Sequence, residues 1–150
     1  MLKLYNSLND RLEEFKPIDE NNIRMYACGI TVYDKSHLGH AKTYITCDIL
    51  FRLLKQLYGN VTYVRNITDV DDKINKRAVE RGITIQELTK EIIEYCNIDM
   101  DYIGNLKPTV EPKATEHIKE IIDIINRLIN NGYAYVAEGH VLFDVRKYKD

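Results

Sequence analysis

The feature that most constrains this chain is a long apolar stripe in helical spacing that stands between two β-rich segments. Apolar residues recur at steps of three and four from residue 38 to residue 57, which predicts one amphipathic helix. Residues 23–28 and 61–67 flank this helix and are rich in apolar, β-branched and aromatic residues, so both are expected to be strands. Strand, helix and strand in this order predict a βαβ unit whose parallel strands are joined by a right-handed crossover. We therefore expect an α/β fold built on a Rossmann-like parallel sheet.

Further elements are expected after this unit. Residues 71–81 are typical of a short helix that ends at Gly82. The capping-box pattern at 84–87, a threonine followed three residues later by a glutamate, predicts a helix that runs to about residue 102. A helix over 114–130 and a β-hairpin formed by 133–137 and 140–145 follow. Pro108 and Pro112 mark a boundary between these last elements and the rest.

Composition excludes several classes of protein. The net charge is −2, so nothing resembles a basic nucleic-acid-binding tail. No apolar run approaches the roughly 20 residues that cross a membrane, and the first residues lack the apolar core of a secretion signal. The three cysteines are odd in number and far apart, which favours reduced thiols in a cytoplasmic protein.

The chemistry is expected at one edge of the sheet. Ligands bind open parallel sheets beyond the carboxyl ends of the strands, where the loops 28–40 and 66–73 meet. His37-Leu38-Gly39-His40 opens the long helix there, and helix amides with two imidazoles favour an anion such as a triphosphate. Gly39 leaves room for a base or a phosphate to approach the backbone. Capping or surface histidines, or a metal-binding pair, are the alternatives.

Two longer stretches carry a resemblance to a known family. His37-Leu-Gly-His40 resembles the His-Ile-Gly-His signature of class I aminoacyl-tRNA synthetases, with leucine in place of isoleucine. The runs Tyr26-Ala-Cys-Gly-Ile-Thr-Val-Tyr-Asp34 and Tyr63-Val-Arg-Asn-Ile-Thr-Asp-Val-Asp-Asp-Lys-Ile74 resemble the cysteine-specific branch of that class. Weaker matches at 112–117 and 132–136 extend the resemblance over nearly the whole chain.

The resemblance implies a function and a set of site residues. The expected activity is that of a cysteine–tRNA ligase, which activates cysteine with ATP and transfers it to tRNA(Cys). His37 and His40 would be catalytic, and with Gly39 they would bind ATP, which enters with Mg²⁺ as substrate. Gly29 and Thr68 would line the pocket for substrate cysteine. Cys28 would be one ligand of a single Zn²⁺ in the full-length chain, whose other ligands lie in later segments.

The resemblance also implies an organisation. Residues 1–112 would form the first half of the Rossmann-like catalytic domain, and residues 113–150 would begin the connective insertion with a helix and a hairpin. The lysine-rich loop of the family and its anticodon-binding domain do not occur here. We therefore expect an amino-terminal portion of a monomeric enzyme, inactive by itself.

Other interpretations stay open at this point. Cys28 taken alone is typical of a small buried apolar residue, and Cys47 and Cys96 are assigned that role. The carboxylates of Asp69, Asp71 and Asp72 could bind Mg²⁺, but a helix start rich in acidic residues is the preferred interpretation. His117 and His140 are assigned no role.

Three rival functions share the motif. The first is a cysteine ligase of the mycothiol-synthesis type, which commonly carries proline where Val32 stands. The second is a small nucleotidyltransferase. The third is a non-catalytic nucleotide-binding fragment.

Overall fold

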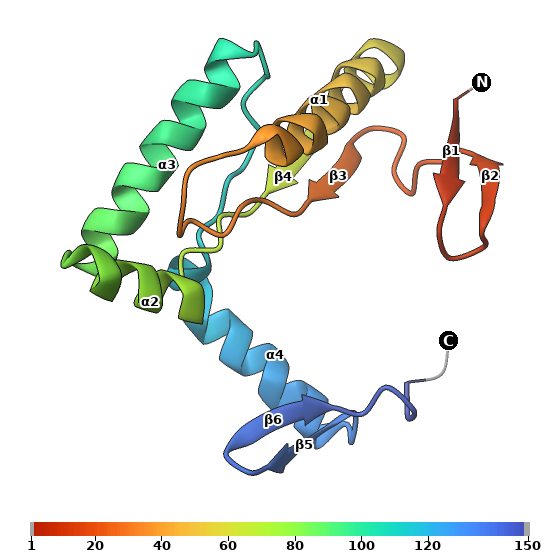
Figure 1. Cartoon of the computed structure of the whole chain (residues 1–150). Helices are drawn as coiled ribbons and strands as arrows, with labels where there is room; N and C mark the ends of the chain where they lie inside the picture. The colour runs from red at the N-terminus through yellow and green to blue at the C-terminus, as the bar shows by residue number, and fades with distance from the viewer. Residues whose placement is uncertain (1, 149–150) are drawn as a thin grey trace.

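A computed structural model describes residues 2–148 of the chain. Figure 1 shows a central parallel strand pair with helices around it, one hairpin beside the amino terminus and another that follows the last helix. The elements in order are β1 (Lys3–Asn6), β2 (Arg11–Glu14), β3 (Ile23–Ala27), α1 (Leu38–Tyr58), β4 (Val61–Arg65), α2 (Asp72–Arg81), α3 (Ile85–Tyr102), the 3₁₀ turn η1 (Ala114–His117), α4 (Ile118–Asn130), β5 (Ala134–Ala137) and β6 (His140–Phe143). No helix within the described residues is long and apolar enough to cross a membrane.

The parallel pair predicted from the sequence is confirmed. β3 and β4 run parallel with Ile23 opposite Val61 and Ala27 opposite Arg65. The long helix α1 begins at Leu38 and ends at Tyr58, as its apolar spacing predicts, and Gly59 follows with a φ of 79°. Because α1 connects two parallel strands, its first turn lies at the end of the sheet toward which both arrows point (Figure 1).

A third segment lies parallel to β4 and extends the sheet. The Arg65 amide donates to the Val110 carbonyl at 3.1 Å, and the Ile67 amide donates to the Pro112 carbonyl at 2.8 Å. The Ala114 amide donates back to the Ile67 carbonyl at 3.0 Å. Isolated parallel bridges join the same two stretches, so the residues around the two prolines belong to the sheet edge. Prolines are tolerated there because an edge needs fewer amide donors.

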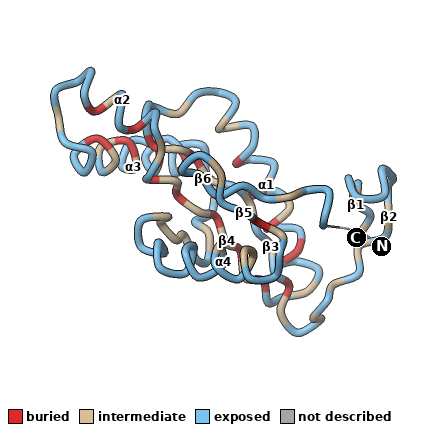
Figure 2. Tube along the Cα trace, turned by 90° about the horizontal axis from the view of Figure 1, so that it is seen from below, coloured by how far each residue is buried: buried red, intermediate tan, exposed pale blue. Residues whose placement is uncertain are grey.

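The core consists of two clusters. One packs the loop after β3 against α1, α2 and α3, and its members are Ile30, Val32, Tyr44, Ile67, Ile74, Ala78, Leu88, Ile92, Cys96 and Met100. The other packs α1 against the strand pair through Ile23, Phe51, Leu54, Val61 and Tyr63. In Figure 2 the buried segments lie in the strands and the helices that contact them, whereas both hairpins are largely exposed. Of the two cysteines predicted to be buried, Cys96 on α3 is in the first cluster, whereas Cys47 on α1 is only partly buried beside the second.

Buried charges fix the sheet edge to α1. Arg65 is 6% exposed, forms an ion pair with Glu111 at 2.8 Å and lies 4.1 Å from the ring centre of Tyr44. Burial opposes the charged guanidinium, but the hydrogen bonds that Arg65 donates to Glu111 and the negative charge of Glu111 outweigh burial and raise the pKa of Arg65. Arg65 thus joins β4, the third segment and α1 through one side chain.

Two parts of the fold differ from the sequence prediction. The antiparallel hairpin of β1 and β2 was not predicted, because its strands are short and polar and Asp10 at its turn adopts a φ of 51°. The helix predicted over 114–130 begins with the 3₁₀ turn η1 before α4 starts at Ile118. The β5–β6 hairpin turns at Glu138 and Gly139, as predicted, and both residues have positive φ.

Candidate active site

Two histidines cap the first turn of α1. His37 is the N-cap residue, and its Nδ1 accepts a hydrogen bond from the Gly39 amide at 3.1 Å. The His37 amide in turn donates to Nδ1 of His40 at 3.2 Å, and the two rings stack with centroids 3.9 Å apart. This is a capping box in which imidazoles take the places usually held by a hydroxyl and a carboxylate. The predicted position of both histidines at the helix start is confirmed.

The caps determine which ring nitrogen carries a proton. Both Nδ1 atoms accept hydrogen bonds, so each neutral imidazole holds its proton on Nε2. Within residues 2–148 neither Nε2 has a hydrogen-bond partner. The capping interpretation and the ligand interpretation are therefore compatible, because capping uses one nitrogen of each ring and leaves the other as a donor.

Burial affects the charge of this pair. The pKa of His40 is lowered, first because the ring is partly desolvated and second because His37 lies beside it. A neutral His40 keeps its Nδ1 lone pair for the His37 amide. The residue is therefore expected to act as a hydrogen-bond donor through Nε2 rather than as a fixed cation.

Gly39 gives room to the cap itself. A Cβ atom at this position would lie 2.8 Å from Cε1 and 3.0 Å from Nδ1 of His37. The absent side chain thus lets the His37 ring fold back over the helix amides. Approach of a nucleotide to the Gly39 backbone stays a prediction.

The loops that follow the two parallel strands are joined at Gly29. A Cβ atom on Gly29 would lie 1.6 Å from the Asn66 carbonyl oxygen, so only glycine fits. The Gly29 amide donates to Oδ1 of Asn66 at 3.0 Å, and Nδ2 of Asn66 donates to Oγ1 of Thr68 at 3.1 Å. Backbone hydrogen bonds between Thr68 and the stretch Ile30–Val32 continue the pairing beyond the strands. Gly29 and Thr68, predicted from separate motifs, are brought together.

Cys28 lies between the end of β3 and Gly29, and its residue is exposed. The alternative of a small buried cysteine does not apply to it. Within the described residues, no three side chains of His, Cys, Asp or Glu lie close enough to hold a metal ion. Cys28 is thus one accessible sulfur donor without neighbouring ligands in this part of the chain, and its role as a zinc ligand stays a prediction.

The loop between Cys28 and His37 is held by contacts that the sequence did not reveal. Asp34 forms an ion pair with Arg77 of α2 at 2.7 Å. The Nζ of Lys35 lies 4.4 Å from the ring centre of Tyr95 on α3. Their sequence positions carry no local pattern, because each contact joins elements more than forty residues apart.

The acidic residues after β4 have structural partners. Asp71 caps α2 by accepting from the Lys73 amide at 2.8 Å. Asp69 is 8% exposed and accepts from the amide and the hydroxyl of Thr115 at 2.9 and 2.5 Å. These contacts agree with the preferred interpretation of a capped helix start and account for Asp69 without a cation.

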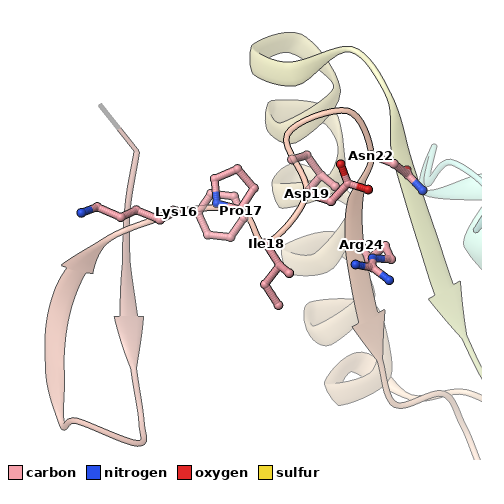
Figure 3. A pocket seen from close by; sticks show the side chains of 8 residues that line it. Lys16, Pro17, Ile18, Asp19, Asn22 and Arg24 are labelled. Carbon is pink, nitrogen blue, oxygen red and sulfur yellow. The ribbon is translucent and has the colours of Figure 1, made fainter.

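Two pockets lie at different distances from the predicted site residues. A pocket of about 260 Å³ lies between the first turn of α1 and the end of α3, and Ser36, His37 and Leu38 line it. The pocket of Figure 3, about 180 Å³, is lined by residues such as Lys16, Asp19 and Arg24 near the amino end of β3. The second pocket contains none of the predicted site residues.

Comparisons with known proteins agree with the resemblance seen in the sequence. A family model described as the tRNA synthetases class I (C) catalytic domain matches residues 14–150. The chain is similar to proteins named cysteine–tRNA ligase, with 56% identity in Beijerinckia indica, 51% in Aliivibrio fischeri and 48% in Vibrio vulnificus. These matches cover 99%, 100% and 100% of the chain and 33% of each relative. The chain thus spans about a third of the length of the curated relatives it matches.

Gly29→Ala is expected to destabilise the protein by at least about 1–3 kcal/mol, because the new methyl meets a backbone oxygen that cannot turn away. Gly39→Ala is the matched control, since its methyl meets only the movable ring of His37. Chemical unfolding of both variants measures the difference. Equal losses would show that Gly29 has more room than its contact with Asn66 implies.

The stability given by the His40 cap is expected to fall in acid. Above the unfolded-state pKa, near 6.5, His40 is neutral in both states and the cap is intact. As the pH drops from there through the lower folded-state pKa, the unfolded chain takes up the proton first, so this stability is lost. His40→Gln keeps an acceptor at the same helix position and does not titrate.

The melting temperatures of wild type and His40→Gln are measured at about pH 7.5 and about pH 5.5, on either side of that pKa. The wild type is expected to lose more on acidification, and all other titrating groups are common to both proteins. The same loss in both would contradict the role of His40.

Proposed function

The chain belongs to the family of class I (C) tRNA synthetase catalytic domains, and from this membership we propose that the natural protein containing it is a cysteine–tRNA ligase. It activates cysteine with ATP to cysteinyl adenylate and transfers the cysteinyl group to tRNA(Cys). The observation that carries the proposal is the pair of capping histidines at the carboxyl edge of the parallel sheet, with two Nε2 donors left over. A cytoplasmic monomer is proposed with it.

ATP binds at the first turn of α1 in this proposal. The helix dipole and the amides of the first turn favour phosphate, and Nε2–H groups of His37 and His40 add two donors without a fixed charge. Gly39 keeps the backbone of that turn accessible on the side that the His37 ring does not cover. Mg²⁺ enters with the nucleotide.

Substrate cysteine binds where the two loops join. Gly29 and Thr68 are fixed side by side through Asn66, and the Cys28 thiol precedes them on the chain. A thiolate is a donor that zinc prefers, and the exposed Cys28 sulfur fits that chemistry as one ligand of a set. A zinc ion held by Cys28 and ligands from later segments would supply a soft Lewis acid for the substrate thiolate, a bond that the serine hydroxyl would not match.

The reaction itself asks for positioning rather than for a covalent side chain. The carboxylate oxygen of cysteine attacks the α-phosphorus of ATP, and the bond to the bridging oxygen of pyrophosphate breaks. His37 and His40 stabilise the charge that spreads over the phosphate oxygens. The loop contact at Gly29 and the helix cap keep the two reactants in line.

The division of the chain follows the same family organisation. Residues 1–112 are proposed as the first half of the catalytic domain and residues 113–150 as the beginning of the connective insertion. In support, the parallel pairing that begins on β4 and continues to Ile67 ends at Ala114, where η1 begins.

The natural protein is expected to exchange labelled pyrophosphate into ATP only when cysteine is present. His40→Ala should lower this exchange by about a hundredfold, since a preorganised donor is lost. His40→Gln should lose nearly as much although it keeps the cap. His117→Ala, an exposed histidine of η1, is the matched control.

Cysteine-independent exchange, or equal losses in the His40 and His117 variants, would contradict the proposal. A second assay offers the product adenylate either tRNA or an aminosugar. Transfer to the aminosugar alone would identify a ligase of the mycothiol type instead.

Cys28→Ala is expected to lower the zinc content of the natural protein well below one ion per chain, because a thiolate ligand is removed. Cys47→Ala is the control, since that thiol is half-buried on α1. Metal analysis measures both, and the ratio of cysteine to serine in the exchange assay should fall only in the Cys28 variant. Full zinc content in Cys28→Ala would overturn the assignment.

A further inference from the structure

The side chain of Asn66 bridges the two loops at the carboxyl edge of the sheet. Its Oδ1 accepts from the Gly29 amide at 3.0 Å, and its Nδ2 donates to the Thr68 hydroxyl oxygen at 3.1 Å. Asn66 follows β4 directly, and Gly29 lies two residues after β3. One amide group therefore connects both strand ends and contacts both residues proposed to line the cysteine pocket.

The orientation of this amide is set by its neighbours. A backbone N–H can only donate, so the amide oxygen must face Gly29. The amide nitrogen must then face Thr68 and occupies one lone pair of its hydroxyl oxygen. Within residues 2–148 no acceptor is found for the hydroxyl proton of Thr68. The half-buried hydroxyl is therefore available as a hydrogen-bond donor to a ligand.

We propose that Asn66 is a positioning residue that holds the Thr68 hydroxyl as a hydrogen-bond donor toward bound cysteine. This inference rests on the proposed function and adds to it a residue that does not itself contact the substrate. Because the amide nitrogen supplies a proton to Thr68, the hydroxyl has to point its own proton away from Asn66. In the pocket, the Thr68 hydroxyl can then donate this proton to an acceptor atom of the bound substrate cysteine.

The chemistry predicts an unusual order among substitutions. Asn66→Asp keeps the acceptor for Gly29 but replaces the donor by an oxygen, so the Thr68 proton turns toward residue 66 and away from the pocket. Asn66→Ala removes both contacts and leaves the hydroxyl free to rotate. If Asn66 acts through Thr68, the isosteric aspartate harms cysteine binding more than alanine does. A purely structural asparagine gives the opposite order, because alanine removes more contacts.

The experiment uses the natural protein and the cysteine-dependent exchange of pyrophosphate into ATP. KM for cysteine is expected to rise about ten- to a hundredfold in Asn66→Asp and by less in Asn66→Ala. A rise of this size corresponds to the loss of one hydrogen bond to a charged ligand. KM for ATP should change by less than about twofold. Zinc content and melting temperature are measured for every variant.

Two further variants sharpen the test. Thr68→Val removes the hydroxyl, and in that background Asn66→Asp should add nothing further, since both changes remove the same donor. Asn22→Asp is the matched control for charge, because Asn22 also contacts a threonine hydroxyl, that of Thr62, at the opposite end of the same strands. Its KM for cysteine should stay within about twofold of wild type.

The outcomes separate the two claims. Absence of cysteine-dependent exchange in the wild type overturns the proposed function and, with it, the role of Asn66. If the wild type exchanges pyrophosphate, three results overturn the role of Asn66 alone. These are an unchanged KM for cysteine in Asn66→Asp, a larger rise of that KM in Asn66→Ala than in Asn66→Asp, and additive effects of Asn66→Asp and Thr68→Val. If Asn66→Asp does not fold, Asn66→Ala takes its place: its KM for cysteine must rise by less than that of Thr68→Val, and the double variant must match Thr68→Val alone. Additive effects of the alanine and valine substitutions overturn the role of Asn66.

Discussion

The contact between Gly29 and the backbone of Asn66 is the constraint on which the rest of the site depends. Parallel strands bring their carboxyl ends to the same edge, but they do not by themselves fix the loops that follow. Here the first loop passes so close to the second that a single methyl group cannot be placed between them. The amide of Asn66 then adds a hydrogen bond to each side of this contact. Cys28 and Thr68 acquire defined positions because these hydrogen bonds, with the backbone pairing of Thr68 to the stretch Ile30–Val32, hold the two loops at this short distance.

At the other part of the edge, helix formation and ligand binding use the same two side chains. A serine and a glutamate would cap α1 as well as His37 and His40 do, but they would present no outward N–H donors. The imidazoles satisfy the first-turn amides with Nδ1 and keep Nε2–H outside. The stacked rings and partial burial favour neutral His40. The imidazole cap consequently depends on pH near neutrality. A cap made by serine and glutamate would not change there, because the glutamate stays ionised above the pKa of its carboxylate.

Local patterns carried the predictions that proved correct. The apolar spacing located both ends of α1, and the capping box at 84–87 located the start of α3, because each signal lies within a few turns of chain. The hairpin of β1 and β2 was missed because four-residue strands with alternating polar residues leave almost no apolar signal. The third parallel segment was interpreted as a boundary because its two prolines conceal its pairing with β4. Asn66 was missed for a different reason: its partner Gly29 lies 37 residues away, and no spacing rule connects the two.

The residues after β4 also show how the site is joined to the second half of the chain. Thr68 faces the loop of Gly29, and the next residue, Asp69, accepts two hydrogen bonds from Thr115 at the start of η1. Two residues before Asn66, the strand itself is paired with Val110, and Arg65 is fixed to Glu111. The β4 exit is therefore held from one side by the loop that carries Cys28 and from the other by the segment that leads to α4. A displacement of η1 relative to the sheet has to break the two hydrogen bonds to Asp69 or move Asp69 with it. Because Asp69 is the neighbour of Thr68 in the chain, the position of η1 is coupled to the position of the Thr68 hydroxyl.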